Sequence, residues 1–527
     1  MKQIINRGSF LTLMFMLLGC LSLYAADNDL ITKQITIKLE KAGTLPDRIE
    51  SSKKYKITNL KIIGEINGTD LKMIRDMAGR TDEFNSTDGK LSVLDLSKAK
   101  IVEGGDSYYC YLGHYYYTSN DVIGRSAFDD CSGLTSLTLP AGITEIGRYA
   151  FDGCSGLTSL TLPAGITYIG QGAFGGCSGL TSLTLPAGIT SIVDDTFSGC
   201  SGLTSLTLPA GITKIGYSAF YGCSGLTSLT LPAGITYIGQ GAFLGCTGLT
   251  SLTLPAGITK IDDYTFRHCT GLTSLTLPAG ITEIGRYAFY DCSGLTSLTL
   301  PAGITKISYD AFQGCRGLKE VRFCINDNLD RYLTKGHPYI NVRCGIKYYI
   351  NDKEITSIEI PSNVTTLGYF VFQNCSGLTS FTLPAGITSI DYGAFYDCSE
   401  LTSLTLPAGI TEIGEKAFEG CSGLTSIYVY AEKVPYIFYH AFEGVDAKKC
   451  TLYVPMGTRD DYRLSGFGDY FENIVEFDAT GIDKTTTSTD VEEVARYSVN
   501  GQPLSAPTKG LNIVKYSDGS VKKVAVR

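Results

Sequence analysis

Histidine and acidic side chains are where catalysis would be expected, and their spacing in this chain supports little. The four histidines stand singly, at His114, His268, His337 and His440. None belongs to an HExxH metal-binding helix, and the chain has no GxSxG nucleophile elbow and no phosphate-binding glycine loop. Adjacent acids such as Asp194-Asp195 and Asp262-Asp263 do not flank a substrate as glycosidase carboxylates must. We therefore expect no enzyme, no cofactor and no bound metal.

Most of the 17 cysteines recur at one position of a repeat. They stand at Cys131, Cys154, Cys177, Cys200, Cys223, Cys246, Cys269, Cys292 and Cys315, and again at Cys375, Cys398 and Cys421. A cysteine at the same phase as leucine and phenylalanine acts as a small buried hydrophobe, so we expect a column of buried thiols. Zinc is not expected, because its ligands must surround one point. Cys324 and Cys344, which flank a break in the repeats, are a candidate disulfide.

The elements that position these residues follow from one unchanged string, GLTSLTLPAGIT. Its copies, 23 residues apart, start at Gly133, Gly156, Gly179, Gly202, Gly225, Gly248, Gly271 and Gly294. The spacing L-x-x-L-x-L puts Leu160 and Leu162 inward on a short strand, which Pro163 ends because it has no amide hydrogen. A second extended piece over 166–169 and an Ala-Phe turn of helix return the chain to the next coil. We expect an α/β repeat: a leucine-rich-repeat solenoid with a long parallel β-sheet, about 16 coils and a small C-terminal β module.

This pattern resembles the BspA-like leucine-rich repeat family of bacterial surface proteins, whose units read L-x-x-L-x-L-P-x-x-I-x-x-I-x-x-x-A-F-x-x-C. The match runs from about Leu134 to Ile427 with one interruption. Glycine stands where other leucine-rich repeats carry a capping asparagine. The resemblance implies an exported or surface-displayed protein of host-associated anaerobic bacteria, in a family of which some members bind extracellular-matrix proteins or other cells. The resemblance does not identify any binding residue in this chain, because the residues of the shared motif build the fold.

Variation between the coils offers a test of the stacking. In the column that directly follows Ile-Thr, no neighbouring coils carry the same charge, and Lys260, Glu283 and Lys306 alternate in sign. If the coils stack, these side chains are cross-strand neighbours, where like charges would repel.

Tyrosines gather on the variable side of the coils and in a loop over residues 108–120, whereas the strand face is a uniform carpet of Ser and Thr. Tyrosine combines a large contact area with a hydrogen-bonding tip, which suits the recognition of protein or sugar. The candidate ligand-binding residues are Tyr108, Tyr109, Tyr111, Tyr115, Tyr116, Tyr117, Tyr217, Tyr221, Tyr264, Tyr287 and Tyr290. Two alternatives stay open: the array tyrosines are solvated filler in duplicated units, and the loop folds over the cap.

The expected organisation has seven parts. The first two parts are a signal peptide (1–25) and an N-terminal cap (26–130), which holds degenerate repeats, a helix over 70–77 and the tyrosine-rich loop. The other five are a regular array (131–323), an insertion (324–354), a second array with a C-terminal cap (355–477), a linker (478–493) and a small sorting-like β module (494–527). The leader carries basic residues before an apolar run that is too short to span a membrane.

Two export signals are visible, one at each end. Near the start, Leu17-Leu18-Gly19-Cys20 resembles a lipoprotein box that would lipidate Cys20, while Leu23-Tyr24-Ala25 offers ordinary signal-peptidase cleavage; both remain open. The last module resembles the C-terminal sorting domains of type IX secretion cargo in 497–501, 510–514 and 521–526, although Asn512 replaces the usual tyrosine. These features imply an extracellular or outer-surface location.

Two functional hypotheses follow. A net charge of −8 with interspersed signs argues against a nucleic-acid partner, and no other stretch of sequence could span a membrane. The first hypothesis is a monomeric surface protein that binds a host extracellular-matrix protein, a mucin glycan or another cell. The second is a structural spacer or envelope display protein without a specific ligand. The residues do not identify the ligand.

Overall fold

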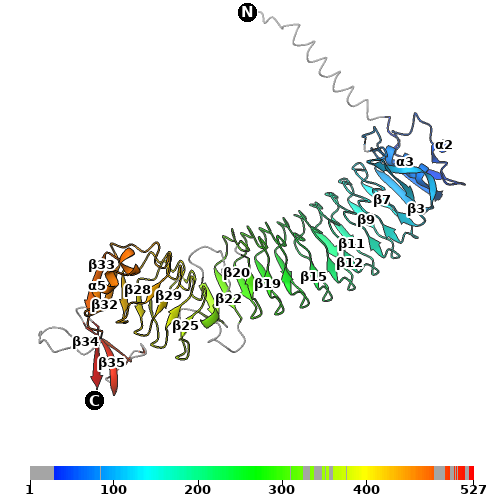
Figure 1. The fold of residues 1–527 in the computed structure, drawn as a ribbon. Helices are drawn as coiled ribbons and strands as arrows, with labels where there is room; N and C mark the ends of the chain where they lie inside the picture. Colours follow the sequence, from blue (N-terminus) through cyan, green and yellow to red (C-terminus); the bar gives the residue numbers. More distant parts are fainter. Residues whose placement is uncertain are drawn as a thin grey trace, which may run out of the picture. The chain divides into compact units, whose positions relative to one another are not determined.

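A computed structural model describes residues 29–479, apart from 84, 309, 325–332, 337–346, 351, 355–359 and 376, and then 493–498, 502, 504, 506, 509–516 and 521–526. It shows a parallel β-solenoid of about 18 turns with few helices, which confirms the predicted leucine-rich-repeat fold. The coil count is close to the expected one. The chain divides into two compact units, with Val321 in the first and Arg322 in the second. Figure 1 labels many of the helices and strands named below.

An N-terminal cap closes the start of the first unit. Its elements are β1 (Ile35–Lys38), α2 (Leu45–Arg48), β2 (Asn59–Ile66), α3 (Gly68–Met77), β3 (Val93–Ile101), β4 (Gly104–Tyr111) and β5 (His114–Thr118). Strands β1, β2 and β3 begin the same parallel sheet that the first repeats continue. The expected helix is α3, which starts at a capping box where the Asp70 carboxylate accepts the Asn67 amide at 2.9 Å.

Most regular coils of the first unit contribute short parallel strands at two corners, as expected, but residues 228–230 form no first-corner strand and the first-corner sheet divides there. The first-corner strands are β7 (Ser136–Thr138), β9 (Ser159–Thr161), β11 (Ser182–Thr184), β13 (Ser205–Thr207), β16 (Ser251–Thr253), β18 (Ser274–Thr276), β20 (Ser297–Leu300) and β22 (Glu320–Phe323). The second-corner strands are β6 (Val122–Ile123), β8 (Glu145–Ile146), β10 (Tyr168–Ile169), β12 (Ser191–Ile192), β14 (Lys214–Ile215), β15 (Tyr237–Ile238), β17 (Lys260–Ile261), β19 (Glu283–Ile284) and β21 (Lys306–Ile307). The central leucine of each three-residue first-corner strand is buried and its Ser and Thr neighbours face outward, because side chains alternate along a strand.

The segment that returns each coil to the next is a run of turns, and the expected turn of helix is absent from it. Two positions per coil have positive φ, as at Tyr149 (φ 55°) and Gly153 (φ 68°). A left-handed residue cannot continue a right-handed helix, so the backbone turns instead.

Hydrogen bonds between equivalent positions hold neighbouring coils in register. The repeat cysteines are buried, and each from Cys154 to Cys315 donates its thiol to a Phe carbonyl of the preceding coil; for Cys200 and Phe174 the distance is 3.0 Å. The Thr204 hydroxyl donates to the Thr181 carbonyl at 3.0 Å, and Phe174 stacks on Phe197 with ring centroids 5.5 Å apart. The predicted column of buried thiols is confirmed, and burial raises the pKa of Cys177 to about 12.

The second-corner strands of the first unit form three separate sheets, β6–β8–β10, β12–β14–β15 and β17–β19–β21. Within each of these sheets, a glycine amide in one coil donates a hydrogen bond to a carbonyl of the preceding coil; Gly170, for example, donates to the Ile146 carbonyl at 2.8 Å. A Cβ on Gly170 would lie 2.6 Å from the Arg148 nitrogen, so the coils approach too closely for a side chain there. Both breaks fall where this glycine is replaced, at Val193 and at Asp262.

The second unit repeats the coil architecture and ends in a cap. Its elements are β23 (Lys347–Ile350), β24 (Lys353–Glu354), β25 (Thr366–Leu367), β26 (Ser380–Thr382), β27 (Ser389–Ile390), β28 (Ser403–Leu406), β29 (Glu412–Ile413), β30 (Ser426–Val429), β31 (Tyr436–Ile437), β32 (Thr451–Pro455), α5 (Arg459–Arg463), η2 (Gly466–Asp469) and β33 (Asn473–Phe477). Strands β34 (Glu493–Ser498), β35 (Gly510–Tyr516) and β36 (Val521–Val526) form an antiparallel sheet in the expected C-terminal module. The expected signal peptide and most of the expected linker lie outside the described residues.

Candidate functional site

The tyrosine-rich loop is an antiparallel hairpin, β4–β5, at the cap. Four side chains of this hairpin are exposed: Tyr111 by 46%, Leu112 by 83%, Tyr115 by 63% and Tyr117 by 55%. We call these four residues the hairpin patch. Exposed aromatic and leucine side chains gathered on one short element are typical of a contact surface.

Two of the predicted ligand-binding tyrosines, Tyr108 and Tyr109, are instead buried, with 1% and 3% of their surface exposed. The Tyr108 hydroxyl donates to the Arg125 carbonyl at 2.9 Å, and the Tyr109 hydroxyl donates to Asp129 at 3.3 Å. The prediction was wrong for this pair, because these side chains pack the base of the hairpin against the cap. Tyr116 is half-buried, with its ring 5.6 Å from that of Tyr109.

A buried arginine anchors the base of the hairpin. Arg75 of α3 is fully buried, donates to the Ser126 carbonyl at 2.6 Å and lies 5.3 Å from the Tyr109 ring centroid. Burial raises the pKa of Asp129 to about 6, although the nearby Arg75 acts in the opposite direction. The hairpin patch therefore projects from a closely packed polar base.

The five array tyrosines among the candidates fall into two groups. Tyr217 and Tyr221 lie exposed on one coil. Tyr264, Tyr287 and Tyr290 are half-buried on two adjacent coils, where they surround the guanidinium of Arg267. We call Tyr264, Arg267, Tyr287 and Tyr290 the arginine–tyrosine cluster.

Arg267 is not among the residues predicted from the sequence, although the repeat period contains the signal. Arg267 stands 23 residues before Tyr290 and shares the column of Tyr221, so it belongs to the same variable surface. The signal for Arg267 is therefore its position in a column that holds long side chains of several types, and not only tyrosine.

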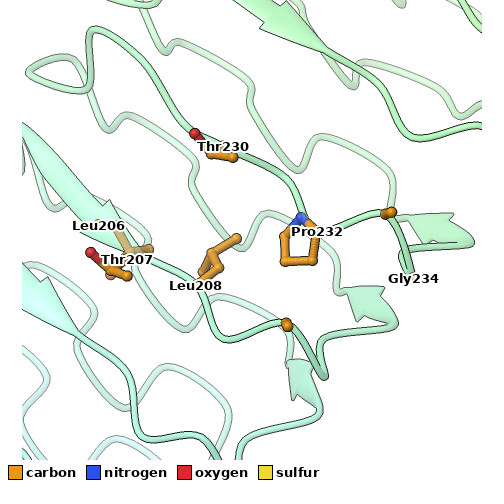
Figure 2. Close-up of a pocket in the computed structure, with 8 residues that line it drawn as sticks. Leu206, Thr207, Leu208, Thr230, Pro232 and Gly234 are labelled. Carbon is orange, nitrogen blue, oxygen red and sulfur yellow. The ribbon is translucent and has the colours of Figure 1, made fainter.

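A shallow hollow lies on the strand face between two coils (Figure 2). It is lined by Leu206, Thr207, Leu208 and Ala210 of one coil and by Thr230, Pro232, Ala233 and Gly234 of the next. Every lining residue belongs to the unchanged string, and none is charged. The hollow therefore offers a ligand no charge and no side chain that the other coils lack.

A second, more polar hollow lies at the second corner. Its lining includes Lys260, Asp263, Glu283, Arg286, Lys306 and Asp310. The strand register pairs Glu283 with Lys260 and with Lys306, and the Lys306 Nζ lies 3.8 Å from a Glu283 carboxylate oxygen. The expectation that this charge-alternating column consists of cross-strand neighbours is confirmed.

The adjacent acids 194–195 and 262–263 each include one carboxylate that accepts a backbone hydrogen bond. Asp194 accepts the Tyr217 amide at 2.8 Å, and Asp263 accepts the Arg286 amide at 2.7 Å, so each carboxylate ties its coil to the next.

The histidines are dispersed through the described residues. His268 lies 3.5 Å from Asp291, His440 pairs with Glu443, His114 begins β5, and His337 lies outside the description. Among the residues that the structure describes, no group of three His, Cys, Asp or Glu side chains could hold a metal ion. No helix within the described ranges has the length and apolar character needed to cross a membrane.

Cys324, one half of the candidate disulfide, is exposed. Its expected partner Cys344 and the possible lipidation residue Cys20 both lie outside the described residues.

The model of the BspA-type leucine-rich repeat region, in six copies, matches residues 108–227, 213–337 and 345–459. No curated protein matches the chain. Among solved structures, a leucine-rich repeat protein from Bacteroides ovatus is 21% identical, with 70% of this chain and 90% of that chain covered and a TM-score of 0.40. A leucine-rich cell surface protein from Faecalibacterium prausnitzii is 24% identical, with 66% and 90% covered and a TM-score of 0.27.

Proposed function

Since the chain belongs to the BspA-type leucine-rich repeat family, we propose that it is a non-enzymatic binding protein of the bacterial surface. In this proposal it attaches its cell to a host extracellular-matrix protein, a mucin glycan or another cell. The solenoid supplies the scaffold, and specificity lies where the coils differ and where the array is interrupted.

The hairpin patch is the observation that carries this proposal. Tyr111, Leu112, Tyr115 and Tyr117 expose apolar and aromatic surface on a short hairpin with a rigid, buried base. Aromatic anchors held in place before binding lose little conformational entropy on contact, so they contribute most of the binding energy in many interfaces. Tyr217 and Tyr221 would add contact area further along the array.

Export completes the proposal. Residues 1–25 would direct the chain out of the cytoplasm, with either cleavage after Ala25 or lipidation of Cys20. The strands of the C-terminal module, β34–β36, would act as a type IX sorting signal. A disulfide between Cys324 and Cys344 would form only in such an oxidising compartment.

A binding assay with the mature chain tests the proposal. Immobilised collagen, fibronectin and mucin serve as probes, and the triple variant Tyr111→Ser, Tyr115→Ser, Tyr117→Ser should weaken binding to at least one probe by about tenfold or more. The control variant carries Tyr168→Ser and Tyr436→Ser, two exposed tyrosines away from the hairpin, and should bind as the parent does. Equal binding by all three proteins would refute the role of the hairpin patch.

The structural-spacer function remains a second candidate because the same hydrogen bonds join successive coils, in ladders that run along the array. Threonine hydroxyls at equivalent positions donate to the same carbonyl of the preceding coil, and the residues of the strand face are the same in successive coils. Such uniformity suits a spacer, in which the length of the array matters more than the chemistry of its surface. A spacer predicts no saturable binding to any probe, whereas the hairpin proposal predicts saturation.

A further inference from the structure

The arginine–tyrosine cluster brings together side chains from two adjacent coils. The Arg267 guanidinium carbon lies 5.6 Å from the ring centroid of Tyr264, 5.9 Å from that of Tyr287 and 5.2 Å from that of Tyr290. The Tyr264 and Tyr287 rings stack at 5.4 Å, and Tyr290 meets Tyr287 edge-on at 5.5 Å. The rings hold the cation in one place through cation–π contacts and leave its N–H donors for other partners.

Those donors lack acceptors. Among the residues that the structure describes, none accepts a hydrogen bond from the Arg267 side chain, and its Nε atom is buried without a partner. Two carboxylates of the same two coils pair with other side chains: Asp291 lies 3.5 Å from His268, and Asp262 pairs with Lys260 at 3.1 Å. A guanidinium that is fixed in position but has no anion beside it is ready to receive one.

The backbone under the cluster is strained in the same two coils. Tyr264 (φ 60°), His268 (φ 58°) and Tyr287 (φ 52°) all take the left-handed conformation, which disfavours bulky side chains. The preceding coil carries Gly241 and Gly245 at the positions of Tyr264 and His268, where glycine adopts this conformation without cost. The same positions are left-handed in other coils as well, as at Tyr149 and Phe370, so this conformation belongs to the coil and not to the cluster alone.

From the partnerless Arg267 guanidinium held among Tyr264, Tyr287 and Tyr290, we propose a binding site for a carboxylate-bearing sugar unit of an acidic glycan. Arg267 pairs with the sugar carboxylate, and the tyrosine rings pack against the apolar C–H face of the sugar ring. This inference rests on the proposed surface location and adds a second site, separate from the hairpin patch.

The surrounding charges favour a sugar over an acidic peptide. Glu283, Asp263 and Asp291 lie on the same two coils as the cluster. The cations Lys260 and Arg286 lie beside Asp263 and Glu283, so the charges have both signs and offer no continuous basic surface to a run of peptide carboxylates, whereas a single carboxylate among neutral sugar hydroxyls needs only Arg267.

Calorimetric titration of the mature chain tests this site. The probes are sialyllactose and a glucuronic-acid disaccharide, with lactose as the neutral comparison and hexaglutamate as the acidic peptide. We expect binding of at least one acidic sugar and a loss of about tenfold or more in Arg267→Gln, because a charge-assisted pair is removed. Arg267→Lys, which keeps the charge without the planar fork, should restore only part of the affinity.

Arg286→Gln is the matched control, since Arg286 is an exposed arginine on the adjacent coil and lies outside the cluster. It should bind as the parent does, and thermal melting should show that the variants are folded. Equal binding of lactose and acidic sugars, preferential binding of hexaglutamate, an equal loss in Arg286→Gln, or no binding at all would each overturn the inference. Hairpin-dependent adhesion is measured separately and should survive in Arg267→Gln, so the two proposals fail independently.

Discussion

At the residue scale, the tyrosines of the β4–β5 hairpin divide into a structural pair and an exposed set. Tyr108 and Tyr109 make buried hydrogen bonds to the cap, whereas Tyr115 and Tyr117 face solvent. The sequence does not reveal this division, because it depends on contacts with Arg125 and Asp129, which follow later in the chain, and on an irregular strand register.

Removing one buried hydroxyl should therefore affect stability without affecting binding. We expect Tyr108→Phe to lower the free energy of unfolding by about 1–2 kcal/mol, because the Arg125 carbonyl loses its donor. Tyr115→Phe, in an exposed position, should change stability by less than about 0.5 kcal/mol. Urea denaturation followed by circular dichroism measures both, and equal effects would contradict the assigned burial.

Asp129 should make the stability of the cap region depend on pH. Burial raises its pKa from 3.8 to about 6 in the folded chain, so the fold favours the protonated carboxyl. Its stabilising effect is present below pH 3.8 and is lost as the pH rises through 6, by at most about 3 kcal/mol. Melting curves from pH 3.5 to 7 should show this fall in the parent, and a flatter profile in Asp129→Asn. An unchanged profile in the variant would exclude Asp129 as the cause.

At the element scale, two positions of the coil together distinguish the places where neighbouring second-corner strands do not pair. Val193 and Asp262 replace the bridging glycine, and the coils that contain them also carry Thr196 and Thr265 where most coils have alanine. Each threonine hydroxyl donates to the carbonyl three residues earlier, at 2.8 Å. Ser308 also replaces the glycine but is followed by alanine, and its amide still reaches the Ile284 carbonyl at 3.0 Å. The second-corner sheets therefore break where the bridging glycine and the alanine three residues later are both replaced.

Restoring the common residues should reconnect the sheets. In the double variant Asp262→Gly, Thr265→Ala, the amide at position 262 should gain a hydrogen bond to the Ile238 carbonyl and exchange more slowly, consistent with about 1 kcal/mol of added local stability. Hydrogen exchange detected by NMR measures this. Ser308→Gly, whose amide is already bonded, should gain no protection, and a similar gain there would count against the explanation.

The identical strings also explain which elements the sequence predicts well. The strands of most coils and the buried thiols follow from the 23-residue period, because the copies have similar local environments. The return segment was expected to be helical, since Ala-Phe spacing does not reveal the left-handed residues at Tyr149 or Gly153. Arg267 was missed because its importance depends on tyrosines that only the stacked coils bring to it.

At the scale of the whole molecule, the first unit is a stack in which contacts join nearest neighbours. The stability of such an array is approximately a sum over coils and the interfaces between them. Its length can therefore change without loss of the fold, provided that complete coils are removed.

Deletion of residues 156–224, three complete coils, should leave a folded chain in which the arginine–tyrosine cluster binds as before and the hairpin patch still binds, with at most the loss of the contact area that Tyr217 and Tyr221 add. Deletion of residues 156–212 ends in mid-coil and should give an unfolded or aggregated product, because the buried leucines lose their phase. Circular dichroism, melting and the two binding assays distinguish these outcomes. Loss of adhesion in the folded three-coil deletion would place the ligand site in the deleted coils instead of the hairpin.

The ladders also bear on how such an array is inherited. A thiol or hydroxyl donor in one coil needs only the matching carbonyl in the coil before it, so these hydrogen bonds can form at a new junction between two coils. Unequal recombination between the repeated segments would then lengthen or shorten the protein by whole coils. A recognition surface shared by two coils, as at Arg267 and Tyr290, is copied only when both coils move together, and so it can be gained or lost as a unit.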